Sequence, residues 1–258
     1  MFITTVANPT VAIVDRAISA SQLLGVPYIE RLNKTVVQMQ REKEDFETIV
    51  VYAMTSRLVR LNQPDLFYHP SMGHVRIKRM LNGEIERMIA ICDIKQGDKV
   101  IDCTAGLCSD SLVFSHAVGE QGTVIAIESN PILFTIMSDG LNNYEGELSE
   151  VVEAGRRINL LHADHFQYLS QCSDKSVDVV YFDPMFDEPL HDSQSMQPLR
   201  GIANEQHLTT LTIEQAIRVA KKRVVMKNNR GSHTFANLGF ESVIHGGTNI
   251  SYGVIEVE

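Results

Sequence analysis

The sequence predicts an α/β protein built on a mostly parallel sheet. Its 258 residues are 44% hydrophobic and 21% charged, which is ordinary globular composition. From about residue 95 onward, short apolar segments typical of strands alternate with helical segments, as in parallel sheets covered on both faces. The chain then closes with two strand-like segments in succession, which add an antiparallel edge to the predicted sheet.

The elements after residue 95 are predicted in a regular order. Five strands are expected at DKVIDCT, TVIAIE, RINLLHA, VDVVYFD and RVVMKN, and helices at SDSLVFSHAVG, PILFTIMSDGL and TIEQAIRVA. The last two strands, FESVIHG and ISYGVIEV, are expected to form a hairpin with a turn at Gly246 and Gly247. Ligands bind outside the carboxyl ends of the strands in such sheets, so functional residues are expected there.

The residues before 95 have a mixed pattern. Residues 9–24 show helical periodicity and stop at Gly25, and residues 48–52 form a β-branched run typical of a strand. Residues 62–69 carry proline and turn formers and are interpreted as a linker, followed by a helix over 75–92. We therefore expect a small α/β N-terminal extension over residues 1–69 and a main domain over residues 70–258.

Composition narrows the classes of protein. Lys and Arg number 23 against 32 Asp and Glu, a formal charge of −9, which argues against coating nucleic acid by bulk charge but leaves room for a local basic patch. No apolar run approaches the roughly 20 residues of a membrane helix, and the N-terminus lacks the features of a signal peptide. The four cysteines lack zinc spacing, so we expect no metal and a cytoplasmic location.

The first strand end combines an acid with a glycine turn. Asp102 is followed by Gly106, which lets the backbone approach a ligand closely, and then by a helix start. The full GxGxxG pattern of nucleotide-binding turns is absent, because Cys108 stands where a second glycine is expected. Taken alone, this turn is explained equally well as a structural glycine after a strand.

The second and third strand ends also carry acids. Glu128 lies 22 residues after Gly106, the spacing at which an acidic residue accepts ribose hydroxyls in doubly wound folds. Asp164 is placed to accept an adenine amino group, although an ordinary helix N-cap explains it too. His165, directly after it, is either part of this site or a surface residue in the first helical turn.

The fourth strand end is the most specific element. The tetrapeptide Asp183-Pro184-Met185-Phe186 resembles the [N/D]PP[Y/F] motif of amino-group methyltransferases. Asp183 and the Pro184 carbonyl are suited to accept the two N–H bonds of an exocyclic amine, and Phe186 offers a face on which a flipped base stacks. The alternative is a structural Asp-Pro turn with a core phenylalanine. Together, the four strand ends are interpreted as an S-adenosylmethionine site; a nicotinamide site would leave this tetrapeptide unexplained.

The chain further resembles a known family. The segments DCTAGLCSD, IESNP, SDGL, LHADH, VVYFDPMF and KRVVMK are similar to those of the small-subunit ribosomal RNA guanine-N2 methyltransferases, and HPSMGHVRIKRMLNGE extends the likeness to residues 70–227. The first 60 residues look more like a related group of uncharacterised bacterial methyltransferases. The resemblance implies a class I methyltransferase fold, S-adenosylmethionine as cofactor, and ribosomal RNA or the small ribosomal subunit as partner.

The resemblance also implies a set of cofactor contacts. With Asp102 and Gly106 from the first turn, they fall on Ser109, Asp110, Glu128, Ser129, Asp164, His165 and Asp183. The sequence departs from the family pattern where Cys108 replaces a glycine, Ser109 and Ser129 replace arginines, and Asp187 replaces a proline. A mixed segment follows Asp187 where the family has a basic loop, so the cofactor is expected to be kept while the RNA target differs.

A phosphate-contacting patch is expected on the helix before the main domain. Arg76 and Arg79 are three residues apart and therefore share a helix face, and His74 lies close in sequence.

The sequence thus predicts methyl transfer from S-adenosylmethionine to an exocyclic amine, with guanine N2 of RNA as the leading substrate. Two alternatives stay open: a methyltransferase of the same fold acting on DNA adenine or a small-molecule amine, and a non-catalytic module that binds the cofactor or RNA.

Overall fold

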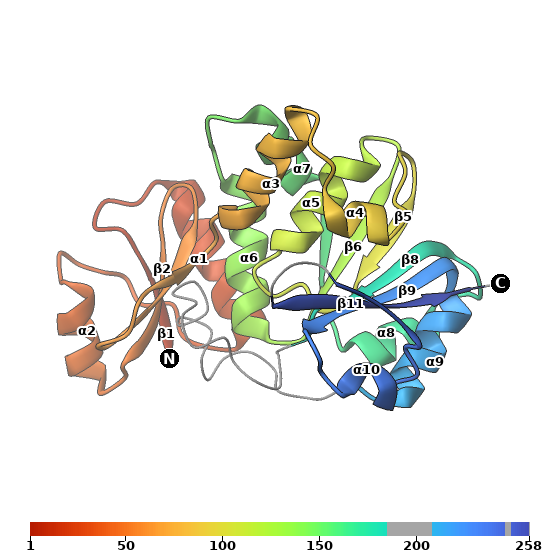
Figure 1. Cartoon of the computed structure of the whole chain (residues 1–258). Helices are drawn as coiled ribbons and strands as arrows, with labels where there is room; N and C mark the ends of the chain where they lie inside the picture. Colours follow the sequence, from red (N-terminus) through yellow and green to blue (C-terminus); the bar gives the residue numbers. More distant parts are fainter. Residues whose placement is uncertain (185–207, 246–248, 258) are drawn as a thin grey trace. The chain divides into compact units, whose positions relative to one another are not determined.

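The computed structural model describes residues 1–184, 208–245 and 249–257, and by its contacts the chain forms two compact units. The first unit includes Met1–His69 and the segment Asn130–Gly146, and the second holds the main sheet. The division into domains 1–69 and 70–258 stays a prediction. Both units are drawn in Figure 1, and each is described by itself.

The first unit is a four-stranded sheet of order β1-β2-β3-β4 with helices packed on it. Strand β1 (Phe2–Thr5) pairs in parallel with β2 (Glu47–Val51), and β3 (Ser56–Arg60) and β4 (Leu66–Phe67) continue antiparallel. Its helices are α1 (Val11–Leu24), α2 (Val36–Lys43) and α6 (Pro131–Asn143).

Two features of this unit bear on the sequence predictions. Helix α1 ends at Gly25 in a left-handed conformation, φ 65°, which confirms that stop. The interpretation of residues 62–69 as a linker is wrong, because Leu66 and Phe67 form β4, and Leu66 and Tyr68 are each only 2% exposed. The turn-forming residues around them masked the sequence pattern of this short strand, whose apolar side chains pack into the core.

The second unit is a seven-stranded sheet, as the sequence predicts, and its strand order is β10-β11-β9-β8-β5-β6-β7. Strands β5 to β9 run parallel, and β10 and β11 form the antiparallel C-terminal hairpin. The expected hairpin turn at Gly246 and Gly247 lies outside the described residues. The strands are β5 (Lys99–Asp102), β6 (Thr123–Glu128), β7 (Ile158–His162), β8 (Val177–Phe182), β9 (Ala220–Asn229), β10 (Ser242–His245) and β11 (Ile250–Glu256).

Helices cover both faces of this sheet (Figure 1). One face packs against α3 (Ser71–Leu81), α4 (Arg87–Ile91), α5 (Ser109–Val118) and α7 (Ser149–Arg156), and the other against α8 (His165–Gln171), α9 (Thr210–Val219) and α10 (Thr234–Asn237). Successive strand residues therefore enter opposite cores. Val179 and Tyr181 lie in the first and Val180 and Phe182 in the second, which explains why β8 reads as an uninterrupted apolar run.

The expected single helix over residues 75–92 is wrong. The structure has two helices there, α3 and α4, because Gly83 adopts φ +85° and the chain turns between them. Helix α3 comes very close to α5 at Gly73, where an added Cβ would lie 2.8 Å from the Leu112 side chain and 3.1 Å from the Ser109 carbonyl oxygen. This close approach brings the polar side chains of α3 within reach of α5.

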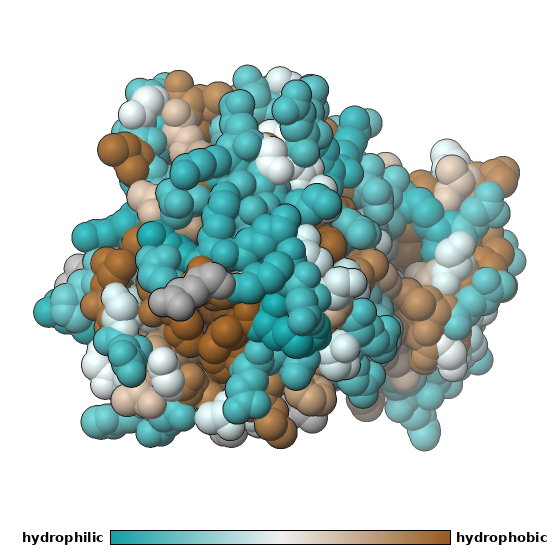
Figure 2. All heavy atoms as spheres, turned by 90° about the vertical axis from the view of Figure 1, so that its right-hand side faces the viewer, coloured by the Kyte–Doolittle hydropathy of each residue, from teal (hydrophilic) through white to brown (hydrophobic). Residues whose placement is uncertain are grey.

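The surface in Figure 2 is predominantly hydrophilic, with hydrophobic side chains gathered in smaller areas. Among the described residues, no helix has the length and apolar character needed to span a membrane.

Candidate active site

The predicted acids lie at the carboxyl ends of the parallel strands, which we call the carboxyl edge. Asp102 is the last residue of β5, Glu128 is the last of β6, Asp164 follows β7, and Asp183 follows β8 directly. Phe182 pairs with Met226 of β9, and this register places Lys227 beside Asp183. Ligand sites of open α/β sheets form at this edge.

The turn after β5 is built around the buried carboxylate of Asp102. Its Oδ1 accepts a hydrogen bond from the Thr104 N–H at 3.1 Å, and its Oδ2 accepts one from the Ser111 hydroxyl. Burial raises the pKa of Asp102 to about 7 against these two hydrogen bonds. Both oxygens are thus occupied by the turn itself, and Asp102 acts by shaping it.

The same turn is fastened to β6. Gly106, at φ +51°, donates its N–H to Glu128 Oε2 at 3.1 Å, and the Ala105 N–H donates to the Ile127 carbonyl at 3.0 Å. Glu128 is only 7% exposed, so its carboxylate is held in place rather than solvated. Cys108, where the family pattern has a glycine, also adopts a positive φ of 60°. Cys108 thus holds a left-handed backbone conformation that glycine adopts most readily.

Ser109 and Ser129 occupy the positions after the first and second strand ends. Ser109 is the first residue of α5, and its carbonyl oxygen faces the glycine of α3 described above. The Ser129 carbonyl lies 3.1 Å from Nε2 of His162, the last residue of β7. Ser129 therefore contributes a backbone contact that joins the ends of β6 and β7.

Asp164 caps helix α8. Its Oδ1 accepts the Gln167 N–H at 2.9 Å, so the N-cap role is present in the structure. His165 lies edge-to-face against Phe182, with ring centroids 6.1 Å apart. Burial lowers the pKa of His165, opposed by the charge of Asp164, so its imidazole is neutral at pH 7.

A charged cluster, made of Arg76, Glu86, Asp110, Asp183 and Lys227, lies on the other side of the carboxyl edge. Lys227 Nζ donates to Asp183 Oδ2 at 2.7 Å and to Asp110 Oδ2 at 3.0 Å. Arg76 donates Nη1 to Asp110 Oδ1 and Nη2 to Glu86 Oε1, the latter at 2.8 Å. The cluster therefore links α3, α5, β9 and the end of β8 through charge-assisted hydrogen bonds.

The charged side chains of the cluster shift one another's pKa values. Burial would raise the pKa of Asp110, but the charges of Lys227 and Arg76 and the hydrogen bond from Tyr181, at 2.7 Å, hold it well below its usual value. Burial raises the pKa of Asp183 to about 6, because the Lys227 charge opposes burial only in part and the Asp110 charge acts with it. Lys227 stays protonated, since the two carboxylates raise its pKa despite burial.

Among the described residues, Asp183 has one side-chain oxygen with a partner and one without. Its backbone N–H donates to Thr104 Oγ1 at 2.6 Å, and its Oδ2 accepts from Lys227. Its Oδ1 is buried and has no hydrogen-bond partner among the described residues. A buried acceptor without a partner costs free energy, so this oxygen is a place where a ligand N–H or O–H would be bound favourably.

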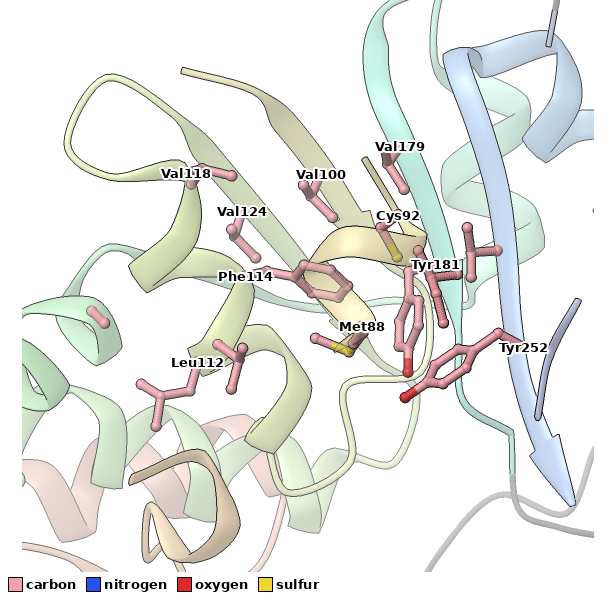
Figure 3. Close-up of a cluster of buried hydrophobic side chains, with 14 of the residues drawn as sticks. Met88, Cys92, Val100, Leu112, Phe114, Val118, Val124, Val179, Tyr181 and Tyr252 are labelled. Atoms are coloured by element: carbon pink, nitrogen blue, oxygen red, sulfur yellow. The ribbon is translucent and has the colours of Figure 1, made fainter. Parts of the chain in front are cut away.

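Aromatic side chains pack beneath the charged cluster, on the side of the apolar core. Tyr181 is fully buried and packs edge-to-face on Phe114, with centroids 4.9 Å apart. Figure 3 shows the rings of Tyr181 and Tyr252 beside each other, with their hydroxyls at neighbouring positions in the view. The Tyr181 hydroxyl donates to Asp110 Oδ2, so this ring connects the apolar core to the charged cluster.

The structure separates the residues of the predicted phosphate patch. Arg76 lies between Asp110 and Glu86 with its side chain 15% exposed, whereas Arg79 is exposed and His74 is half-buried. Both arginines lie on α3, but this helix packs Gly73 and Ile77 inward, and Arg76, beside them, reaches the carboxylates of α5 and of the chain before α4. A phosphate patch that includes Arg76 therefore stays a prediction.

Sequence reasoning missed the partners of the predicted acids. Lys227 was visible only as a basic residue after a strand, and Tyr181, Thr104 and Ser111 carried no signal in one sequence. Pro184 directly follows Asp183, while Phe186 lies outside the described residues. Among the residues that the structure describes, no group of His, Cys, Asp and Glu is arranged to hold a metal ion.

The seven-stranded sheet with its antiparallel hairpin and the acids along its carboxyl edge define the class: a class I S-adenosylmethionine-dependent methyltransferase. A crystal structure of a SAM-dependent methyltransferase from Neisseria gonorrhoeae shares this fold, with a TM-score of 0.67 over 99% of this chain and 96% of that one, at 20% sequence identity.

The chain belongs to the family described as "Putative SAM-dependent methyltransferase", whose model matches residues 34–249. It is 37% identical over 254 residues, 98% of each chain, to "Uncharacterized protein YpiP" of Bacillus subtilis. It is also 32% identical over 134 residues to "Ribosomal RNA small subunit methyltransferase J" of Acinetobacter baylyi, covering 50% of this chain and 47% of that protein. The chain thus spans about half the length of that ribosomal RNA methyltransferase. The protein is an enzyme whose cofactor is S-adenosylmethionine.

Proposed function

We propose that this enzyme methylates an exocyclic amine of RNA, with guanine N2 of ribosomal RNA as the first substrate to test. The observation that carries the proposal is the buried Oδ1 of Asp183 at the carboxyl edge, which has no hydrogen-bond partner among the described residues. An amine N–H is the partner that such an oxygen lacks, and a carboxylate accepts it strongly.

The residues of the edge fit the cofactor. Glu128 offers its carboxylate to the ribose hydroxyls, and Asp164, whose Oδ1 caps α8, has a second oxygen for the adenine amine. Gly106 has no side chain to cover the turn, so the backbone there can approach the methionine portion. Ser109, Ser129 and His165 border the same turns, whereas Asp102 and Asp110 support the site from within. When bound, S-adenosylmethionine supplies an electrophilic methyl group on its sulfonium.

Asp183 orients the amine. The lone pair of a nucleobase amine is delocalised into the ring, and an N–H bound to Asp183 Oδ1 turns the nitrogen so that the lone pair points out of the ring plane. The Pro184 carbonyl is proposed to accept the second N–H. Little acid–base power is needed, because positioning provides most of the rate enhancement. The amine proton leaves late, to Asp183 or to water.

RNA is favoured over other amine substrates by the relatives. The match to proteins named ribosomal RNA small subunit methyltransferase J includes several at 30–33% identity. Arg79, exposed on α3, is proposed to contact RNA phosphate with His74, and Phe186 is proposed to stack on the target base. Arg76 supports this surface by holding α3 in place.

A labelled-methyl assay tests the proposal. Cofactor labelled in its methyl group is incubated with the full chain and, separately, with small ribosomal subunits, deproteinised ribosomal RNA, DNA or small amines. We expect label in ribosomal RNA or the subunit, recovered as a methylguanosine after digestion to nucleosides. Label in DNA adenine or a small amine would replace the RNA proposal by the corresponding methyltransferase.

The variant Asp183→Asn is the control in this assay. It keeps the side-chain shape, so label transfer should fall while cofactor binding persists. Absence of label from every acceptor with the wild-type protein, at saturating cofactor, would favour the non-catalytic binding module instead.

A further inference from the structure

Lys227 is held between two carboxylates at the point where the reaction is proposed to occur. Its ammonium lies 2.7 Å from Asp183 Oδ2 and 3.0 Å from Asp110 Oδ2, and its side chain is only 16% exposed. A lysine ammonium has three N–H donors, and two of them are used by these carboxylates. Here the second partner ties the orientation of Asp183 to residues on two other elements.

We infer that Lys227 is a positioning residue for methyl transfer: it engages Asp183 Oδ2 so that Oδ1 faces the amine, and it keeps Asp183 ionised at neutral pH. The inference rests on the proposed amine-orienting role of Asp183 and deepens it. Lys227 itself touches neither the amine nor the cofactor in this account.

The position of Lys227 is fixed by Asp110, which is itself held by other residues. Asp110 Oδ2 also accepts the Tyr181 hydroxyl at 2.7 Å, and Asp110 Oδ1 accepts from Arg76. Arg76 is in turn anchored by Glu86 at 2.8 Å. The chain Glu86–Arg76–Asp110–Lys227–Asp183 therefore alternates in sign from one residue to the next, which makes each member a favourable neighbour of the following one.

This series of alternating charges also determines which oxygen of Asp183 is available to a ligand. Lys227 occupies Oδ2, and no described residue donates to Oδ1. Without Lys227, the carboxylate is free to rotate and both oxygens compete for the amine. Protonation of Asp183 would convert an acceptor into a hydroxyl donor, which repels an amine N–H.

Groups of both signs face Asp183 from the elements packed around it. Lys227 and Arg76 favour its ionised form, while burial and the Asp110 charge oppose it and leave its pKa raised to about 6. Removing Lys227 should therefore raise the pKa of Asp183 further, whereas removing the Asp110 charge should lower it. The groups in its electrostatic surroundings are Asp102, Asp110, Arg76, Lys227, Tyr181 and Tyr252.

These opposite shifts define the experiment. The full chain is labelled with ¹³C at its aspartate carboxyl carbons, and the resonance absent from Asp183→Asn is assigned to Asp183. We expect it to titrate near pH 6 in the wild type and about 1 unit or more higher in Lys227→Met. Lys227→Arg retains the cation and should titrate close to the wild type. Asp110→Asn should titrate lower.

The pH profile of turnover is the second readout. The acid limb of kcat should move upward in Lys227→Met and downward in Asp110→Asn, since turnover is lost as pH falls through the pKa of Asp183. At the optimum, Lys227→Met should lose about tenfold or more in kcat, less than the roughly 10²-fold of a directly lost preorganised contact, because Lys227 acts through Asp183. Its affinity for S-adenosylhomocysteine should stay close to that of the wild type.

An unchanged Asp183 titration in Lys227→Met would overturn the inference, as would shifts of the same direction in Lys227→Met and Asp110→Asn. If Lys227→Met does not fold, Asp110→Asn decides alone: an unchanged or upward shift overturns the inference. Correct titrations without RNA methylation would overturn the proposed substrate only.

Discussion

The two halves of the carboxyl edge hold their acids by different means. At the ends of β6 and β7, Glu128 and Asp164 accept backbone N–H groups, from Gly106 and Gln167. At the end of β8, Asp183 is paired with Lys227 of β9, and Asp110 of α5 is paired with both Lys227 and Arg76. Backbone donors fix an orientation, whereas charged side chains also determine protonation.

We propose that this difference separates cofactor binding from the chemistry of methyl transfer. A carboxylate held by backbone N–H groups can offer its remaining lone pairs to neutral hydroxyls and amines of a cofactor. A carboxylate in a charged cluster has its pKa set by its neighbours, which matters where a reacting amine must be oriented. Changes in the first half are therefore expected to alter affinity, and changes in the second half to alter turnover.

The largest effect is expected on folding, from loss of a charge inside the cluster. Arg76→Ala leaves Asp110 and Glu86 without their shared partner and should lower the free energy of unfolding by about 3 kcal/mol. Arg79→Ala, on the same helix but exposed, should change it by less than about 0.5 kcal/mol. Urea denaturation of both variants measures the difference. Equal losses would mean that Arg76 is not structurally engaged.

Asp183→Asn should lower kcat by roughly 10²-fold or more, because the amide carries no charge and has a single acceptor oxygen. The matched control is Asp178→Asn on the same strand, whose carboxylate lies at the opposite end of β8 and accepts the Lys99 N–H at 2.8 Å. That variant should keep its turnover. Steady-state methylation of the same acceptor compares the two, and similar kcat values would remove Asp183 from the chemistry.

Glu128→Ala should weaken S-adenosylhomocysteine binding by about 2 kcal/mol, since it removes a charged acceptor for the ribose hydroxyls. Glu128→Gln keeps an oxygen for the Gly106 N–H and should lose less. Isothermal calorimetry measures both. If the glutamine variant lost as much affinity as the alanine variant, the charge of Glu128 would matter more than its hydrogen bond to the Gly106 N–H. If neither variant lost affinity, the assignment of Glu128 to the ribose would be wrong.

The smallest effect is expected at the exposed end of α3. If Arg79 contacts one phosphate of single-stranded RNA, Arg79→Ala should reduce the slope of log affinity against log salt by roughly 0.7. Binding assays over a range of salt concentrations test this, and cofactor affinity should not change. An unaltered slope would place the RNA-contacting surface elsewhere on the chain.

The sheet and its acids could be predicted because each rests on a local pattern. Two-sided apolar runs mark buried parallel strands, and acids at strand ends are visible in the sequence alone. The N-terminal elements were harder. Strand β4 is two residues long within turn formers, and the break between α3 and α4 depends on the positive φ of Gly83.

The charged cluster could not be predicted, because its members are far apart in sequence. Asp110 and Lys227 are separated by 117 residues, and only the pairing register of β8 and β9 places Lys227 beside Asp183. The helix periodicity that put Arg76 and Arg79 on one face was sound, but it does not show which side chain a neighbouring helix covers. The close packing at Gly73 decides that.

The most direct test compares one variant from each half of the carboxyl edge in the same two assays. Glu128→Ala and Asp183→Asn are each measured for S-adenosylhomocysteine affinity by calorimetry and for single-turnover methyl transfer at saturating cofactor. We expect a crossed result: Glu128→Ala loses affinity by about 2 kcal/mol and keeps its rate, and Asp183→Asn keeps its affinity and loses roughly 10²-fold in rate. Parallel losses of affinity and rate in both variants would contradict it.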